Sequence, residues 1–442
     1  MNATMMKKVQ RMKRGNRDEY YASRNWHIIE AALEYFISIM VTGAFLARIT
    51  GELGFSDSLT GIISAFVSLG CVFQLGAIIF FRGMQHVKRP VIILQGINEI
   101  LFATVYLCPI LPLGRTAKTV LFLICFCGGY MLLNLLRSPK SNWMISLVSD
   151  GERGIFTAKK EMFSLISGMI FTYVMGSMID YVEAAGNSRM AFVIGVISMC
   201  ALMGLHISNM LLIKEKPREA AEKKSPLESV KELINNKPLM RVILAISIWN
   251  VGYFSAIPFY GVYQINELGF SMTFVSVLSI GYSIVRTIFS PMMGRLGDRK
   301  SFSYMCMVCF IIAFFSFLVN CFTVPENGKI FYSLHYCLFA VSMAGASGAQ
   351  SNMVYDLIKG ENRQNALAFT LAICGVVGFV TTCLMSPVVD MIQKNGNQVL
   401  GIPMYAQQFV SGVACVMTLI SIIYMKKNII GKQEKEELAQ NH

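Results

Sequence analysis

Glu52-Leu53-Gly54-Phe55-Ser56 recurs 215 positions further along the chain as Glu267-Leu268-Gly269-Phe270-Ser271. Each copy lies between the first two long apolar runs of its half. Other residues repeat at a nearly equal offset of 210. These pairs are Ser141-Asn142 with Ser351-Asn352, Arg153 with Arg363, Gly168 with Gly378, and Asp180 with Asp390. Matches in register over so much of the chain predict two similar halves.

The composition around these repeats is that of a membrane protein. Of the 442 residues, 54% are hydrophobic and only 15% are charged, and the mean hydropathy is +0.53. Soluble domains carry about 25% charged residues. The apolar runs reach about 20 residues, the length that crosses a bilayer as a helix, and only helices or closed barrels satisfy their backbone in lipid. Because the runs are too long for barrel strands, we expect an all-α membrane protein.

The runs predict twelve spanning helices, six in each half. Their expected limits are 27–48, 57–81, 90–110, 117–148, 161–184, 190–213, 239–264, 270–293, 302–323, 329–357, 366–391 and 403–425. The expected organisation is a basic cytoplasmic tail over 1–26, a six-helix bundle over 27–213, a linker over 214–238, a six-helix bundle over 239–425 and a tail over 426–442.

Basic residues are distributed unevenly between the two faces that twelve spans define. Of the 39 Lys and Arg residues, 30 fall on the side of both termini, 6 on the other side and 3 within spans. Because Lys and Arg concentrate in cytoplasmic loops, we expect both termini in the cytoplasm and the protein in the plasma membrane. The net charge of +13 then faces anionic lipid, so we expect no nucleic-acid partner.

The linker is rich in Lys and Glu. Within it, Ser225-Pro226-Leu227-Glu228 has the form of a capping box with proline in the first turn. The apolar residues that follow fall on one face. We expect a short amphipathic helix on the inner membrane surface.

After the eighth predicted helix the chain reads Gly294-Arg295-Leu296-Gly297-Asp298-Arg299-Lys300. Gly294 allows a tight exit from a helix, and Asp298 can cap a helix or pair with a basic residue. This stretch resembles the G-x-L-x-D-R signature of the major facilitator superfamily, and 142–154 resembles that family's loop after helix four. With the helix count and the repeat, the resemblance covers essentially the whole chain. It implies two pseudo-symmetric six-helix bundles and a conformational latch at Gly294, Asp298 and Arg299. The equivalent stretch of the first half, 82–89, has no aspartate.

Charged residues inside the predicted spans are candidates for function, because each costs about 3 kcal/mol at the bilayer centre. Those assigned to a coupling network are Glu30, Glu34, Glu99, Arg137, Lys140 and Arg286. In the family that the motif resembles, helices one, four, seven and ten line a central cavity. This implies that Glu30 and Glu34 face Arg137 and Lys140. We predict that a carboxylate of this network changes protonation during function; static salt bridges between helices are the alternative.

Helices seven and ten of the second half are rich in aromatic and amide side chains. The residues assigned to a substrate cavity are Trp249, Asn250, Tyr253, Gln350, Asn352, Asn134 and Tyr130. This mixture suits a polar solute that stacks and hydrogen-bonds, and we expect helices seven and ten to dominate solute selection. The alternative is that the tyrosines form interfacial belts.

These observations favour a secondary active transporter that works by alternating access, with proton-coupled import of a small polar solute such as a sugar or organic acid. Proton-coupled efflux of drugs or metabolites is the first alternative, and a non-transporting sensor is the second. We expect no enzyme activity, since no catalytic or metal-binding set is evident and His206 stands alone in helix six. We expect no cofactor other than a coupling proton, a small-molecule substrate and the lipid bilayer as partners, and a monomer.

Overall fold

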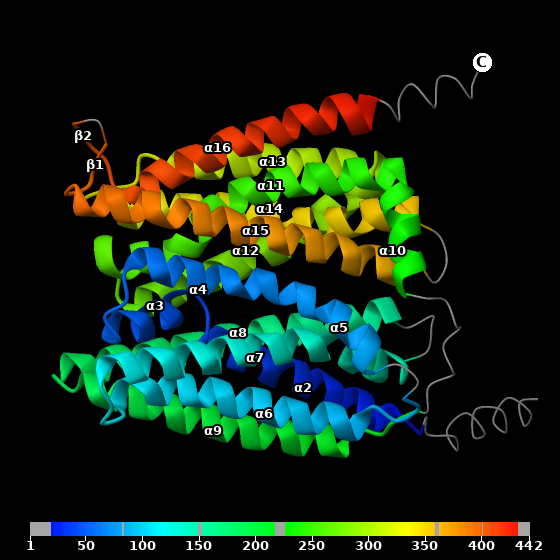
Figure 1. Ribbon diagram of the computed structural model, residues 1–442, viewed down its shortest axis with the longest axis horizontal. Helices are drawn as coiled ribbons and strands as arrows, with labels where there is room; N and C mark the ends of the chain where they lie inside the picture. Colours follow the sequence, from blue (N-terminus) through cyan, green and yellow to red (C-terminus); the bar gives the residue numbers. More distant parts are fainter. Residues whose placement is uncertain are drawn as a thin grey trace, which may run out of the picture.

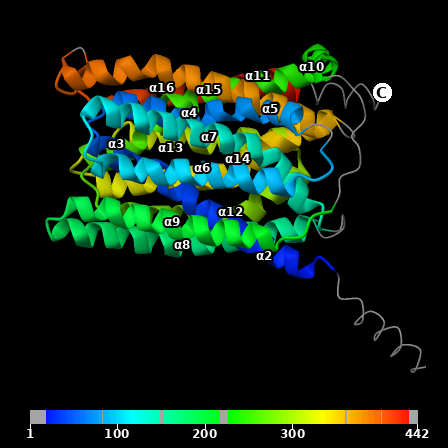
Figure 2. The same ribbon diagram turned by 60° about the horizontal axis from the view of Figure 1, so that its bottom comes forward.

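The computed structural model describes residues 19–81, 84–148, 153–216, 226–358, 362–399 and 401–431 (Figure 1). The predicted basic residues before residue 19, Ser225 of the predicted capping box and the tail beyond residue 431 lie outside these ranges. Long helices run side by side along the molecule (Figures 1 and 2). The short helix α10 (Pro226–Asn235) lies at one end, which we call the linker end, and the two-residue strands β1 (Gln398–Val399) and β2 (Ile402–Pro403) lie at the other, the hairpin end.

Helices occupy all twelve predicted ranges. The first half contains α2 (Tyr21–Met40), α3 (Gly43–Glu52), α4 (Asp57–Leu69), η1 (Gly70–Val72), α5 (Phe73–Phe80), α6 (Lys88–Leu107), η2 (Cys108–Ile110), α7 (Arg115–Ile145), α8 (Arg153–Ala184) and α9 (Ser188–Leu212). The second half contains α11 (Lys237–Val262), η4 (Tyr263–Glu267), α12 (Met272–Arg299), α13 (Phe302–Asn320), α14 (Gly328–Leu357), α15 (Asn362–Lys394), α16 (Ala406–Met425) and η5 (Lys426–Ile430).

Within the described ranges, 10 helices are long and apolar enough to cross a membrane. The number is 11 if α2 and α3, which meet at a bend of 40°, form one span. The second predicted span is not continuous, because η1 divides it into α4 and α5. At that break a Cβ on Gly70 would lie 2.3 Å from the side-chain nitrogen of Asn134 in α7. The close approach of α7 therefore depends on glycine there.

The pentapeptide repeat has the same structure in both halves. α3 ends at Glu52 and η4 ends at Glu267. The glycine that follows each has a positive φ, +71° at Gly54 and +62° at Gly269, a conformation that glycine adopts readily. Ser56 and Ser271 then accept hydrogen bonds from the backbone N–H three residues later, which is how a serine begins a helix.

A second pair of repeated glycines lets helices pack closely within each half. A Cβ on Gly168 of α8 would lie 2.3 Å from Cε1 of Tyr35 in α2. A Cβ on Gly378 of α15 would lie 2.5 Å from Cδ2 of Phe254 in α11. In each half, an aromatic ring of the first helix thus covers a glycine of the fifth.

The two halves contact each other through α4 with α11 and α15, α3 with α11, and α8 with α12. The Asp180 carboxylate at the end of α8 accepts hydrogen bonds from the N–H groups of Met272 (3.0 Å) and Thr273 (2.6 Å) at the start of α12. The Asp57 carboxylate accepts from Asn266 (3.0 Å) and Gln393 (2.7 Å). Ser58 also bonds to Ser386, the Ser276 hydroxyl donates to the Thr172 backbone oxygen, and the Thr273 hydroxyl donates to Asp180. They hold the halves together toward the hairpin end.

The stretch assigned as a latch is helical rather than part of a loop. α12 continues to Arg299, so Gly294 and Asp298 lie in its last two turns. A Cβ on Gly294 would meet nothing within 4 Å, whereas one on Gly297 would lie 2.8 Å from the sulfur of Met305 in α13. The prediction of a tight helix exit at Gly294 is therefore wrong, and Gly297 is the glycine that close packing requires. Asp298 and Arg299 are exposed.

Candidate functional site

A cavity of about 1530 Å³ lies between the two halves. Residues of α2, α3, α4, α6, α7 and α8 line it from the first half, and residues of α11, α12 and α14 from the second. The lining extends toward the linker end, where it includes Ile145 and Lys160. Toward the other end it reaches Ala47, Thr60 and Val262, and a Cβ on Gly261 there would lie 3.0 Å from the backbone of Gly43. The cavity thus extends to the region where the hairpin-end contacts begin.

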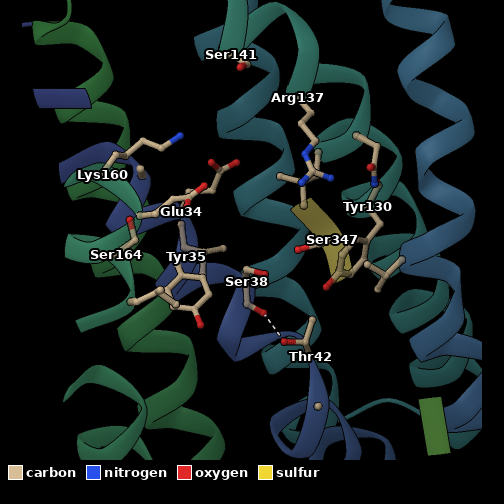
Figure 3. A pocket seen from close by; sticks show the side chains of 18 of the residues that line it. Glu34, Tyr35, Ser38, Thr42, Tyr130, Arg137, Ser141, Lys160, Ser164 and Ser347 are labelled. Carbon is tan, nitrogen blue, oxygen red and sulfur yellow. Dashed lines mark hydrogen bonds between the residues drawn. The ribbon is translucent and has the colours of Figure 1, made fainter. Parts of the chain in front are cut away.

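The break between α2 and α3 lies in the wall of this cavity. The Thr42 hydroxyl donates to the backbone oxygen of Ser38 at 2.9 Å (Figure 3). Gly43 follows with φ +56°. A threonine that bonds back to the preceding turn bends a helix, and a residue with positive φ ends it. The break places Thr42 and Gly43 beside α11 of the other half.

Glu30, Glu34 and Lys140 form the cavity-side part of a charged cluster. The Lys140 ammonium lies 3.1 Å from Oε1 of Glu30 and also contacts the Glu34 carboxylate. Glu30 is 1% exposed and Lys140 6%, whereas the Glu34 side chain is 32% exposed. All three line the cavity. The lysine thus links a buried carboxylate to one that faces the cavity.

His206 extends this cluster away from the cavity. Its Nε2 lies 3.3 Å from Glu30 Oε1, and its Nδ1 contacts Glu99. Gln95 donates to Glu99 Oε1 at 2.9 Å, and the other Glu99 oxygen has no hydrogen-bond partner among the described residues. His27 lies 3.0 Å from the second oxygen of Glu30. The histidine that the sequence left without partners therefore joins α2, α6 and α9.

The cluster is short of positive charge. Its acids are Glu30, Glu34 and Glu99, and Lys140 is its only lysine or arginine in the described ranges. A buried group of charges is costly unless it is balanced. The imbalance of two negative charges is removed when protons reside on the two histidines or on the carboxylates. Taken alone, the cluster therefore has two more acids than lysines and arginines, and His27 and His206 are its other titratable groups.

Arg137 and Arg286 stand apart from this cluster. Both line the cavity, Arg137 from α7 and Arg286 from α12. Of the two cations expected to face Glu30 and Glu34, Lys140 contacts them, and Arg137 forms no ion pair among the described residues. Arg286 likewise has no carboxylate partner there, so it does not belong to the network in which the sequence placed it. In Figure 3, Glu34 and Lys160 project from one wall of the cavity and Arg137 from another.

Three of the residues assigned to a substrate cavity line this one: Tyr130, Asn134 and Tyr253. Tyr130 is 1% exposed, and its hydroxyl donates to the backbone oxygen of Val41 at 3.3 Å. The Asn134 amide donates to the Tyr130 backbone oxygen at 2.9 Å and accepts from Gln74 at 3.3 Å. Both side chains support the broken helices of the first half as well as the cavity wall.

The other four assigned residues do not line the cavity. Trp249 is 2% exposed and stacks on Phe310, with ring centroids 4.2 Å apart. The Asn250 amide donates to the backbone oxygen of Cys374 at 3.1 Å. Gln350 and Asn352 are half-buried on α14 away from the cavity lining. The correction has a physical reason: Trp249 and Asn250 contact other parts of the second half, and helical spacing in a uniformly apolar span does not tell a core face from a cavity face.

The aromatic groups around His335, Tyr332 and Tyr260 form a core in the second half, whereas Tyr253 and Phe254 line the cavity. His335 is 1% exposed, and its Nδ1 lies 2.9 Å from the Ser316 hydroxyl. Gln264 donates to the Tyr332 hydroxyl at 2.7 Å, and the hydroxyls of Tyr260 and Ser411 are 2.6 Å apart. From α14, only Ala344, Ser347 and Gly348 reach the cavity. Helix ten thus contributes small groups, contrary to the expectation that it dominates recognition.

Long apolar helices in two matched sets around a polar cavity define an integral membrane protein with a transporter fold. The chain belongs to the Major Facilitator Superfamily, whose family model matches residues 31–382. No curated protein sequence matches it.

Solved transporters share the fold at low identity. A mutant of the nucleoside transporter NupG is 14% identical, with a TM-score of 0.71 over 92% of this chain and 99% of that chain. A D-xylose–proton symporter is 13% identical, with a TM-score of 0.68 over 92% and 97%. A bacterial homologue of the human lysosomal transporter Spinster, inward-facing and unoccupied, is 14% identical, with a TM-score of 0.69 over 92% and 96%. Family and fold point to a transporter of small molecules rather than an enzyme.

Proposed function

We propose that this protein is a secondary active transporter that imports a small polar solute, of the sugar or organic-acid class, together with protons. The observation that carries the proposal is the cluster of Glu30, Glu34, Lys140, His206 and Glu99. Protons on its histidines or carboxylates would balance its charge, and it reaches the cavity at Glu30 and Glu34. A proton held beside a solute site is what coupling requires.

The proposed membrane arrangement has twelve spans in two six-helix bundles, with both termini in the cytoplasm and the protein acting as a monomer in the plasma membrane. The excess of basic residues on the side of the termini supports this orientation. In it, the linker end is cytoplasmic. The hydrogen bonds of Asp180 and Asp57 then close the outer side, and the cavity faces inward.

Alternating access follows from this arrangement. The two halves would rock about the cavity, so that the hairpin-end contacts separate while the linker end closes. Support from similar folds comes from a nucleoside transporter and a D-xylose–proton symporter, whose solutes are polar. No cofactor is needed in this scheme, and the proton is the coupling ion.

The test is accumulation of solutes in proteoliposomes with and without an inward proton gradient. Glu30→Gln with Glu34→Gln removes both cavity-side carboxylates. Glu326→Gln is the matched control, since Glu326 is exposed in the turn before α14 and lies outside the cavity. We expect the gradient to drive accumulation in the wild type and the control, and not in the double variant.

Accumulation that ignores the gradient and survives the double variant would contradict proton coupling. Proton-driven loss of preloaded solute, without uptake, would instead establish efflux and overturn the direction proposed here.

A further inference from the structure

Two arginines face the cavity and form no ion pair with the residues that the structure describes. Arg137 of α7 and Arg286 of α12 line it, one from each half. In the described part of the chain neither forms an ion pair, whereas the third cation of the spans, Lys140, contacts two carboxylates. The carboxylates nearest the cavity are therefore already engaged by another residue.

An arginine within a span cannot avoid the cost of its unpaired charge by losing its proton. Lysine, histidine and the acids can become neutral when buried, but a guanidinium stays charged at every physiological pH. Within a span such a charge faces water or an anion. Because both arginines line the cavity, a solute inside it can contact them.

The surroundings of Arg286 supply hydroxyl donors. It lies within electrostatic range of the phenol groups of Tyr35, Tyr253 and Tyr282, which come from α2, α11 and α12. Tyr35 and Tyr253 also line the cavity, as does Ser290 one turn along α12. A guanidinium beside hydroxyl groups matches the acceptor oxygens of a carboxylate or phosphate.

The other charged residues of the lining do not cancel the preference of the cavity for an anionic group. Glu161 and Lys160 are neighbours on α8 toward the linker end and offset each other. His27 lies against Glu30. The described lining contains the acids Glu30, Glu34 and Glu161 and the bases Arg137, Lys140, Lys160 and Arg286, so one positive charge is left in excess.

We propose that the transported solute is a small organic anion, whose carboxylate or phosphate group is held between Arg137 and Arg286. The inference rests on the proposed transport function and narrows its solute from polar to anionic. A guanidinium offers two parallel N–H donors to such a group, which gives geometric selectivity as well as attraction.

The placement of the arginines also links binding to movement. They belong to different halves, and closing the linker end draws the walls of the cavity together. The two positively charged arginines repel each other as the walls approach, and a bound anion between them reduces that repulsion. The solute thereby favours the closed arrangement over the open one.

The experiment offers proteoliposomes an equimolar pool of metabolites arranged in matched sets. Each set contains one carbon skeleton as a neutral form, a carboxylate and a phosphate monoester: a sugar with its uronate and its phosphate, or a nucleoside with its monophosphate. Mass spectrometry of the vesicle contents, with protein-free vesicles as blank, identifies what has entered. We expect only anionic members to accumulate, and the carboxylate and phosphate arms to show which oxyanion is used.

Arg137→Gln and Arg286→Gln should each reduce that uptake roughly tenfold or more, since each removes charge-assisted hydrogen bonds. Arg189→Gln is the matched control, because Arg189 is exposed at the start of α9 and outside the cavity. If a glutamine variant fails to fold, as judged by its melting temperature and gel filtration, Arg→Lys replaces it. Lysine keeps the charge but loses the paired donors, so KM should rise while kcat changes little.

Accumulation of neutral members, or anion uptake that survives both arginine substitutions, would overturn the anionic solute while leaving transport intact. Absence of uptake of every member of the pool would count against the transport function itself.

Discussion

The two halves of this protein share a backbone plan and differ in how they treat buried polar groups. In the first half, Glu30, Lys140 and His206 form a cluster of ion pairs that also includes Glu34 and Glu99. In the second, His335 and Tyr260 form fixed hydrogen bonds with serine hydroxyls inside an aromatic core. The two halves thus have similar helix packing and differ in the chemistry of their buried polar groups. The first half holds the charged cluster, and the second contributes Arg286 to the described cavity wall.

The largest expected effect is on the first half. Lys140→Met removes the cation that lies between Glu30 and Glu34 and leaves their charges uncompensated. Breaking a buried ion pair from one side costs about 3 kcal/mol or more of the unfolding free energy. Thermal unfolding of the detergent-solubilised protein should show this loss, and proton-driven uptake should cease.

A double-mutant cycle checks the cause. Adding Glu30→Gln to Lys140→Met removes the orphaned charge and should restore part of the stability. A Lys140→Met variant as stable as the wild type would mean that the cluster does not depend on its lysine.

The second-largest expected effect is a loss of stability on replacing a repeated glycine, and it should be equal in the two halves. Gly168→Ala and Gly378→Ala each place a Cβ within 2.3–2.5 Å of an aromatic ring. Such overpacking costs about 1–3 kcal/mol. Gly412→Ala is the control, since nothing lies within 4 Å of its Cβ, and alanine there should be neutral or slightly stabilising. A loss of stability at one of the repeated glycines alone would show that the packing symmetry is less complete than the coordinates indicate.

Asp180 and Asp390 are another repeated pair. Substituting the two residues should have different effects on stability. Asp180 accepts two backbone N–H groups at the start of α12, whereas Asp390 contacts Lys394 of its own helix at 2.5 Å. Asp180→Asn should weaken the first turn of α12 by about 1 kcal/mol. Hydrogen exchange of the Met272 and Thr273 amides should therefore speed up roughly fivefold.

Asp390→Asn should change stability by only about 0.4 kcal/mol, as for an exposed pair one helical turn apart. Equal effects of the two substitutions on exchange at α12 would remove the special role of Asp180 in closing the hairpin end.

The fold was largely predictable from the sequence because runs of about 20 apolar residues leave a membrane chain few alternatives. The repeat at Glu52 and Glu267 also marked equivalent helix ends correctly. The breaks at Gly43 and Gly70 were not predicted. The break at Gly70 depends on Asn134 in another helix, whereas at Gly43 the available signal was local, the Thr42-Gly43 pair. The helical latch motif was missed for a related reason: polar residues in a last helical turn resemble a loop.

The candidate site was only partly predictable. Glu30, Lys140 and Arg286 could be singled out because charge within a span is costly. The partners of His206 come from α2 and α6, more than 100 residues away in sequence, so no local pattern reveals them. A membrane-embedded histidine was the signal available. Trp249 shows the converse, since a large aromatic side chain at a cavity-facing depth packs instead against Phe310.

The central claim is that protons move through the first half and not the second, and two buried histidines allow a direct measurement. A pH-sensitive dye inside proteoliposomes reports proton entry during solute influx, and exchange of labelled for unlabelled solute reports binding and movement alone. The account predicts that His206→Gln abolishes solute-dependent proton entry while exchange persists, and that His335→Gln leaves proton entry intact. Proton entry that survives His206→Gln, or is lost equally with His335→Gln, would contradict it.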